Sequence, residues 1–108
     1  MSTDARVVLC TVPSTHVAEQ IARALLEEQL VACVNVVPGV RSLYRWQGQV
    51  EEAQEHLLVM KTGAARYPAL EARIRALHPY EVCEVIALDV VAGSAPYLAW
   101  VLGETRRE

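Results

Sequence analysis

Several sequence patterns that signal common enzymes are absent from this chain of 108 residues. There is no Gly-x-Gly-x-x-Gly pattern, no phosphate loop with Gly-Lys-Ser/Thr and no Gly-x-Ser-x-Gly pattern. No nucleophile, base and orienting residue stand out together. We therefore expect a protein that is not an enzyme.

The chain also lacks an excess of basic residues and any long apolar run. Its 10 Lys and Arg residues against 13 Asp and Glu residues give a net charge of −3. The one basic doublet, Arg106 with Arg107, lies beside Glu104 and Glu108. No stretch approaches the roughly 18 apolar residues of a membrane helix. We expect neither a nucleic acid nor a membrane as partner.

Cysteine is scarce and unpatterned. The three cysteines include no Cys-x-x-Cys pair, and their odd number fits free thiols in a reducing compartment. The first residues, Met-Ser-Thr-Asp-Ala-Arg, show no charged segment followed by an apolar one. Together these observations predict a cytoplasmic protein.

What the chain has in abundance is apolar residues, which make up 53% of it. Its length fits one domain, residues 1–108. This apolar content is above the usual share for a soluble domain of this size. A subunit interface is the simplest place to bury the surplus.

The most distinctive stretch, residues 32–62, predicts two long strands folded back on each other. Gly48 supplies the positive φ that a tight turn between them needs. Pro38 and Gly39 interrupt the first strand and predict a bulge, because proline cannot donate a hydrogen bond to its neighbour.

The tip of this hairpin is unusually apolar. Leu43, Tyr44 and Trp46 would project into water from a domain too small to cover them. We therefore expect the hairpin to contact another chain. The alternative is a solvent-facing hairpin with a few exposed aromatic residues.

The remaining periodicity predicts strands at 6–12 and 82–91, with helices at 16–29, from 63 to the residue before Pro79, and from Ser94 onward. This order predicts an α+β, ferredoxin-like split βαβ fold: βαββαβ plus a C-terminal helix. Its four antiparallel strands would lie in the order 4-1-3-2, with both main helices on one face. The uncovered face is a second argument for assembly.

One candidate metal site follows from this topology. The start of the last strand should lie beside the end of the first, which brings His78, Tyr80 and Glu81 close to Cys10. Thiolate and imidazole together suit copper and zinc ions. The alternative is that Cys10 is a core residue and His78 caps a helix end, since two ligands are too few for a closed structural site.

The other cysteines and histidines are weaker candidates. Strand alternation would place Glu81 and Cys83 on one face of the last strand. Cys33 or Cys83 could add a metal ligand, although packing is the commoner role of such residues. His16 and His56 are expected to be surface or structural residues.

Taken together, several stretches make the sequence resemble the CutA family of divalent-cation tolerance proteins. They are Val-Val-Leu-Cys-Thr at 7–11, Leu-Val-Ala-Cys-Val-Asn at 30–35, Pro-Gly at 38–39, Ser-Leu-Tyr-Arg-Trp-Gln-Gly at 42–48, Leu-Val-Met-Lys-Thr at 58–62, His-Pro-Tyr-Glu at 78–81 and Tyr-Leu-Ala-Trp at 97–100. They follow one another over nearly the whole chain.

The resemblance implies a homotrimer in which each long hairpin extends a subunit's sheet onto its neighbour. It also implies an association with copper and other divalent metals. Of the copper ligands proposed in that family, a strand cysteine maps to Cys10 and a histidine before Pro-Tyr maps to His78. The preceding histidine maps to Leu77, so one ligand is missing here.

Three functions remain open from the sequence. The first is a cytoplasmic homotrimer that binds copper, or a similar ion such as zinc, in metal homeostasis. The second is a trimeric small-ligand or signalling module of the nitrogen-regulatory type, with Tyr80, Glu81, Lys61 and Trp46 in clefts between subunits. The last is an acylphosphatase-type enzyme, which the missing glycine-rich phosphate cradle disfavours.

Overall fold

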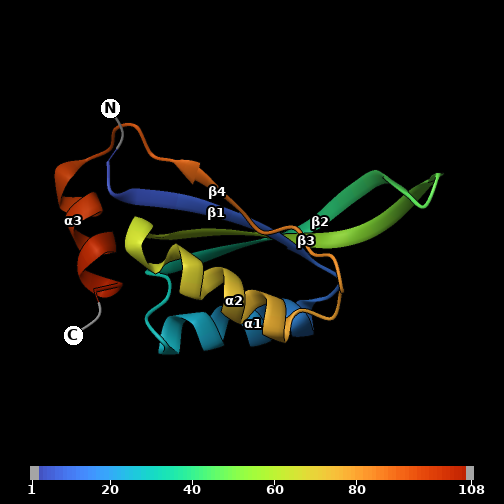
Figure 1. Cartoon of the computed structure of the whole chain (residues 1–108), viewed down its shortest axis with the longest axis horizontal. Coiled ribbons are helices and arrows are strands. Elements are labelled where there is room, and N and C mark those ends of the chain that lie inside the picture. Colours follow the sequence, from blue (N-terminus) through green and yellow to red (C-terminus); the bar gives the residue numbers. More distant parts are fainter. Residues whose placement is uncertain (1–2, 107–108) are drawn as a thin grey trace.

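The computed structural model describes residues 3–106 of the chain (Figure 1). In chain order its elements are β1 (Ala5–Val12), α1 (Thr15–Glu27), β2 (Cys33–Trp46), β3 (Gln49–Gly63), a short 3-10 helix (Ala64–Arg66), α2 (Tyr67–Leu77), β4 (Ile86–Asp89) and α3 (Ala95–Glu104). Within the described residues, no helix has both the length and the apolar character needed to cross a membrane.

The four strands form one antiparallel sheet. Their order is β2-β3-β1-β4, which is the predicted order read from the opposite edge. β1 pairs with β3 along its whole length and with β4 along residues 6–9. The predicted α+β class and strand order are confirmed.

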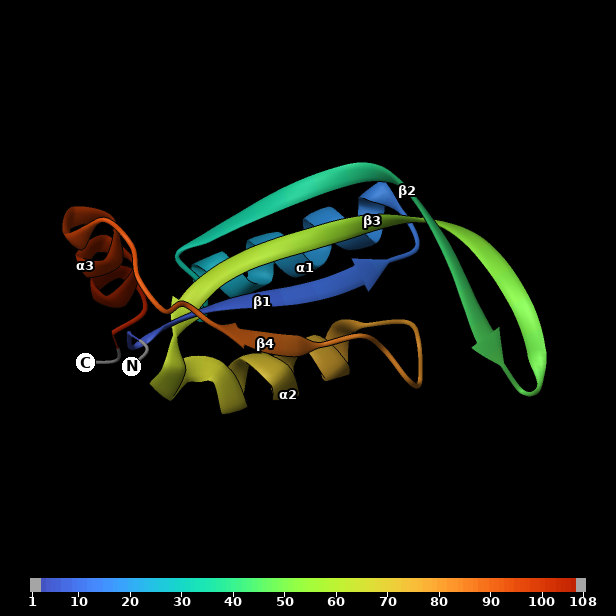
Figure 2. The same ribbon diagram turned by 90° about the horizontal axis from the view of Figure 1, so that it is seen from above.

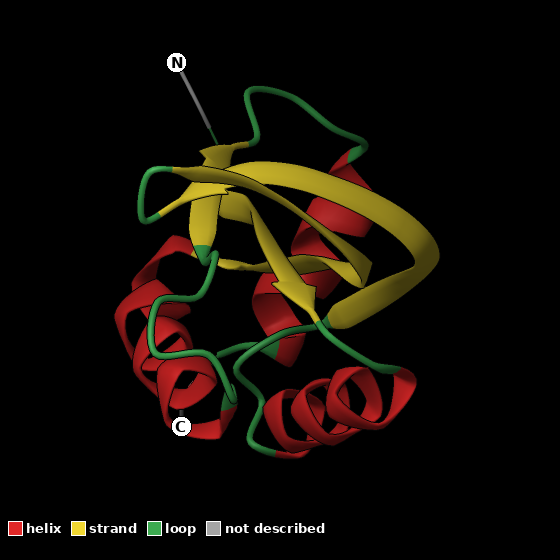
Figure 3. Cartoon of the chain, turned by 90° about the vertical axis from the view of Figure 1, so that its right-hand side faces the viewer, coloured by secondary structure: helices red, strands yellow, loops and turns green. Residues whose placement is uncertain are grey.

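Both main helices lie against the same face of the sheet, and α3 packs at one end of it (Figures 1 and 3). Alternate residues of the two central strands point into the layer between sheet and helices. The core formed there includes Val8, Cys10, Val12, Ile21, Leu25, Leu58, Met60, Leu70 and Ile74. Among the described residues, neither α1 nor α2 lies over the other face of the sheet.

Local sequence signals explain where the helices begin and end. The Ser14 side chain accepts a hydrogen bond from the N–H of Val17 at 3.2 Å and caps α1. Pro68 lies in the first turn of α2, where no N–H is needed. That helix ends at Leu77, and His78 after it is extended (φ −73°, ψ 136°) because Pro79 disfavours a helical residue before it.

The predicted hairpin is present and extends beyond the body of the domain (Figure 2). Its two-residue turn uses positive φ at Gln47 (50°) and Gly48 (79°), which matches the twist of the strands. The register shifts between Val37 and Val40, so the predicted bulge is also present. At the tip, Leu43 is 59% exposed in the single chain.

The last strand is shorter than predicted, with four residues in place of ten. Two backbone carbonyls, one before β4 and one at the end of β1, bond to side chains where a longer ladder between these strands would have formed. The Tyr67 hydroxyl donates to the carbonyl of Val85 at 3.3 Å, and the His78 ring bonds to the carbonyl of Thr11 at 2.7 Å. Glu81 and Cys83 therefore lie in a loop, and the prediction that they share a strand face is wrong.

Candidate functional site

His78 lies where the topology predicted, beside the end of β1. Its side chain is buried, with 7% of the residue exposed. Nε2 lies 2.7 Å from the carbonyl oxygen of Thr11. Nδ1 accepts a hydrogen bond from the backbone N–H of Tyr80 at 3.1 Å. Both ring nitrogens are therefore in hydrogen bonds.

Cys10 is fully buried in the layer between the sheet and the helices. Burial raises the pKa of its thiol to about 12, and Cys83, Glu84 and Glu55 contribute to the rise because they carry or can acquire negative charge. Its Sγ lies 3.7 Å from the same Thr11 carbonyl oxygen that His78 contacts. At neutral pH this residue is a thiol and a weak donor.

The two predicted ligands are thus close together but are arranged as proton donors. A metal ion needs a thiolate and a free imidazole lone pair. Here the thiol and Nε2 both face one carbonyl oxygen, and the lone pair of Nδ1 faces an amide. Leu77, at the third position, packs against the core. Across residues 3–106, no group of three or more His, Cys, Asp or Glu side chains could hold a metal ion. As placed, these residues do not fit a bound copper ion.

A cleft of 650 Å³ lies between the hairpin and the loop that follows α2. It contains three of the four side chains predicted for a ligand cleft, namely Trp46, Tyr80 and Glu81. Sequence reasoning missed Glu55, which also lines it: this carboxylate is 7% exposed and accepts from the Tyr80 hydroxyl at 3.1 Å. Burial, and then Glu55, raise the pKa of Tyr80.

Lys61, the fourth predicted residue, lies outside that cleft, on the uncovered face of the sheet. Its ammonium group donates to the Asn35 side-chain oxygen and lies 3.7 Å from the Cys33 sulfur. Tyr97 of α3 is close by, and its pKa is raised by burial and by Cys33. The pattern Cys-Val-Asn gave no sign that its first and third side chains would meet this lysine, because their strand lies far from Lys61 in sequence.

Among the remaining candidates, His56 has a buried Nδ1 with no hydrogen-bond partner in the described residues. His16 is exposed at the start of α1. His56 contacts the Thr15 hydroxyl through Nε2 at 3.0 Å. Cys33 and Cys83 are half-buried free thiols.

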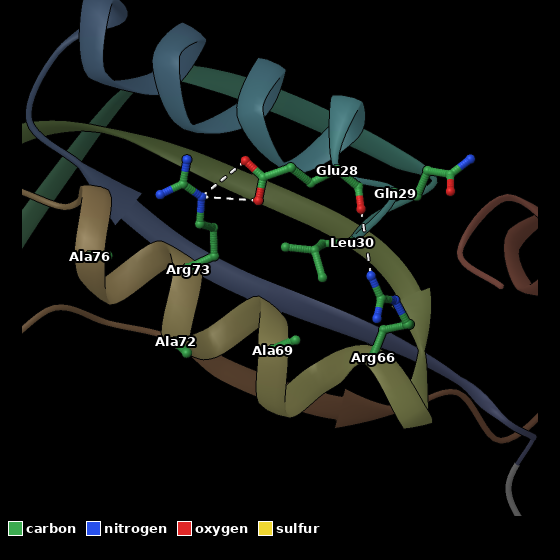
Figure 4. A pocket seen from close by; sticks show the side chains of 8 residues that line it. All are labelled: Glu28, Gln29, Leu30, Arg66, Ala69, Ala72, Arg73 and Ala76. Carbon is green, nitrogen blue, oxygen red and sulfur yellow. Dashed lines mark hydrogen bonds and ion pairs between the residues drawn. The ribbon is translucent and has the colours of Figure 1, made fainter. Parts of the chain in front are cut away.

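A second groove, of 670 Å³, separates the end of α1 from α2 (Figure 4). The carboxylate of Glu28 pairs with Arg73 across it at 3.0 Å. Arg66 reaches the backbone carbonyl of Glu28 from the other end at 3.5 Å. Gln29, Leu30 and three alanines of α2 complete the lining. With one carboxylate and two guanidinium groups, the groove has one net positive charge.

Comparison with known proteins gives a consistent result. The family model described as CutA1 divalent ion tolerance protein matches residues 6–104. The divalent-cation tolerance protein CutA of Thermus thermophilus is 54% identical over 99 residues, which cover 92% of this chain and 96% of that protein. A solved structure of the divalent cation tolerance protein (Cut A1) from Thermus thermophilus has a TM-score of 0.93 at 53% identity, and the match covers 94% of this chain and 99% of that chain.

Some relatives are longer than this chain. The chloroplastic CutA protein of Arabidopsis thaliana is 42% identical over 100 residues, which cover 93% of this chain but 55% of that protein. The chain therefore spans about half the length of that relative, whose name assigns it to the chloroplast.

Proposed function

Since this chain belongs to the CutA1 divalent ion tolerance family, we propose that it acts in divalent-cation tolerance as a cytoplasmic homotrimer with a ferredoxin-like subunit. The observation that carries the assembly is the uncovered face of the sheet. α1 and α2 lie on the opposite side and α3 lies at one end of the sheet, so most of this face has no helix of the described residues over it (Figure 3).

The uncovered face is apolar across the sheet. On β4, Ile86 and Leu88 are 49% and 47% exposed. Val37 on β2 is exposed as well, and Leu57 and Val59 on β3 are half-buried. Together with the hairpin tip, these exposed apolar side chains are the kind of surface that marks a protein–protein interface.

A matched pair of variants tests the assembly. Leu88→Glu places a charge on the uncovered face, whereas Leu26→Glu places the same charge on α1, where Leu26 is 41% exposed. We expect light scattering to give three times 11.9 kDa for the native chain and for Leu26→Glu, and a lower mass for Leu88→Glu. A native chain that stays monomeric at micromolar concentration contradicts the proposal.

Copper, or a similar ion such as zinc, is the cargo we propose. The family's association with divalent-cation tolerance supports this part. Cys10 and His78 are the ligands that the sequence predicts; since they do not fit a bound ion as placed, their part in binding is tested separately. Copper titrations into the native chain, Cys10→Ser and His78→Ala test it. If the three isotherms are identical, these residues do not bind the ion.

The cellular role is tested separately. The native chain and Leu88→Glu can be expressed in a bacterial strain that lacks its own CutA protein, under divalent-metal stress. We expect the native chain to restore growth and to be found in the cytoplasmic fraction of the cells. Growth no better than with an empty vector contradicts the proposed role in tolerance.

A small-ligand module is the second candidate, and the cleft with Trp46 and Tyr80 supports it. Its lining holds the carboxylates of Glu55, Glu81 and Glu84, whereas its one arginine, Arg41, is already paired with Glu52. This charge balance favours an organic cation over a nucleotide. A thermal-shift screen with nucleotides, organic anions and organic ammonium ions decides: no stabilisation by any of them eliminates this candidate.

A further inference from the structure

The His78 side chain connects two parts of the fold that are far apart in sequence. The backbone N–H of His78 donates to the carbonyl oxygen of Ile74 at 2.8 Å and closes the last turn of α2. The extended backbone before Pro79 then directs the chain towards the sheet. The ring lies between the end of β1 and the loop that leads to β4.

The hydrogen bonds of the ring define its tautomer. The Tyr80 backbone N–H can only donate, so Nδ1 must be the acceptor. In a neutral imidazole the proton then lies on Nε2, which donates to the Thr11 carbonyl oxygen. Neither nitrogen has a free lone pair.

Further contacts extend from the His78 ring, through Tyr80, to β3. The His78 and Tyr80 rings are tilted by 49°, with centroids 4.8 Å apart. The Tyr80 hydroxyl donates to Glu55 on β3 at 3.1 Å. Thr11, His78, Tyr80 and Glu55 therefore tie β1, the loop and β3 together.

We propose that His78 is a positioning residue that clasps residues 78–85 to the sheet, and that a ring and a Cys10 thiol held in this way do not fit a zinc or copper ion. The clasp concerns the metal part of the proposed function, on which it rests for the choice of test ions, and it does not require the trimer.

Long-range proton–nitrogen correlation spectra of the ¹⁵N-labelled chain test the clasp directly. We expect His78 to show the Nε2–H tautomer and the exposed His16 to show an average of both tautomers. One equivalent of Zn²⁺, which is diamagnetic, should leave both His78 nitrogen shifts unchanged. An Nδ1–H tautomer, or His78 shifts that move with one equivalent of zinc, would overturn the proposal.

Thermal unfolding with zinc supplies a second readout, with His16→Gln as the matched control for His78→Gln. We expect excess zinc to leave the native midpoint unchanged or lower it. A rise of the unfolding midpoint that both variants keep would show that zinc binds at a site without His16 or His78, which agrees with the closed clasp. A rise seen in the native chain and His16→Gln but lost in His78→Gln contradicts it. Light scattering and the growth assay report separately on the trimer and on tolerance.

Discussion

The two faces of the sheet are built from the same strands, yet they have different surroundings. On the covered face, Val8, Leu58 and Met60 are fully buried. On the other, Ile86 and Leu88 remain about half exposed although they are equally apolar. Along β3 itself, Leu57 and Val59 are half-buried and alternate with the buried Leu58 and Met60, so residues of one strand differ in burial and not in character.

The difference arises from the connections. β1 and β2 are parallel with β3 between them, and β3 and β4 are parallel with β1 between them. Helical crossovers between parallel strands share one hand, so α1 and α2 arrive on the same side. The described residues make no third crossover for the other side, and an apolar face left open in this way suits another copy of the subunit.

The largest expected effect comes from truncating a core residue on the covered face. Met60→Ala leaves a cavity and should lower the free energy of unfolding by about 2–5 kcal/mol. Val59→Ala, one residue away on the other face, should cost less at low protein concentration and more as the subunits associate. Urea unfolding at several concentrations measures both. Equal, concentration-independent losses would break the comparison between the faces.

A buried hydroxyl on the covered face gives the next effect. Thr62 is fully buried and donates to the Leu30 carbonyl at 2.7 Å. Thr62→Val leaves that carbonyl without its donor and should cost about 1–3 kcal/mol of unfolding free energy. Thr62→Ser keeps the hydroxyl and should lose less. A serine variant as unstable as the valine variant would contradict this order and show that the methyl group contributes as much as the hydrogen bond.

The helix that covers this face depends on its cap. Ser14→Ala removes the acceptor for the Val17 N–H and should cost about 1 kcal/mol. Ser14→Asp, which can still accept that bond, should recover most of the loss in the same urea titration. No difference between alanine and aspartate would remove the cap from the explanation of α1.

The smallest effect is expected at the exposed hairpin. The hydrogen bond with Arg41 lowers the pKa of Glu52. A carboxyl whose pKa is lower in the folded state adds stability above its unfolded pKa, about 4.3, and loses it as the pH falls through the folded value. Glu52→Gln should remove this slight acid sensitivity and change little at neutral pH. Parallel urea midpoints for both proteins across the acid range would contradict it.

The topology could be predicted because its signals are local. Pro68, Pro79 and the serine caps delimit the helices, and Gly48 marks the turn. The start of β4 could not be predicted, because the residues before it have strand-forming side chains. Their path depends on two hydrogen bonds. The Tyr67 side chain of α2 bonds to the Val85 carbonyl, and the His78 side chain, just after that helix, bonds to β1.

For the candidate site, the position in the fold could be predicted but the contacts of its side chains could not. Strand order correctly placed His78 beside the end of β1. It could not show that the ring bonds to a backbone carbonyl and a backbone amide, because nearly every residue offers these groups. Glu55 was missed for a related reason: a single acidic residue in a strand is ordinarily exposed, and its burial depends on Tyr80 from another segment.

The bulge between Val37 and Val40 changes which alternate residues of β2 lie on each side of the hairpin in its outer half. Beyond it Val40 faces Glu55, so Tyr44 and Trp46 follow in the row on that side. If the full-length strand paired regularly through this point, the rows would be exchanged and Leu43 and Arg45 would lie there instead. The bulge, and not composition, therefore selects which side chains the arm offers to a neighbour.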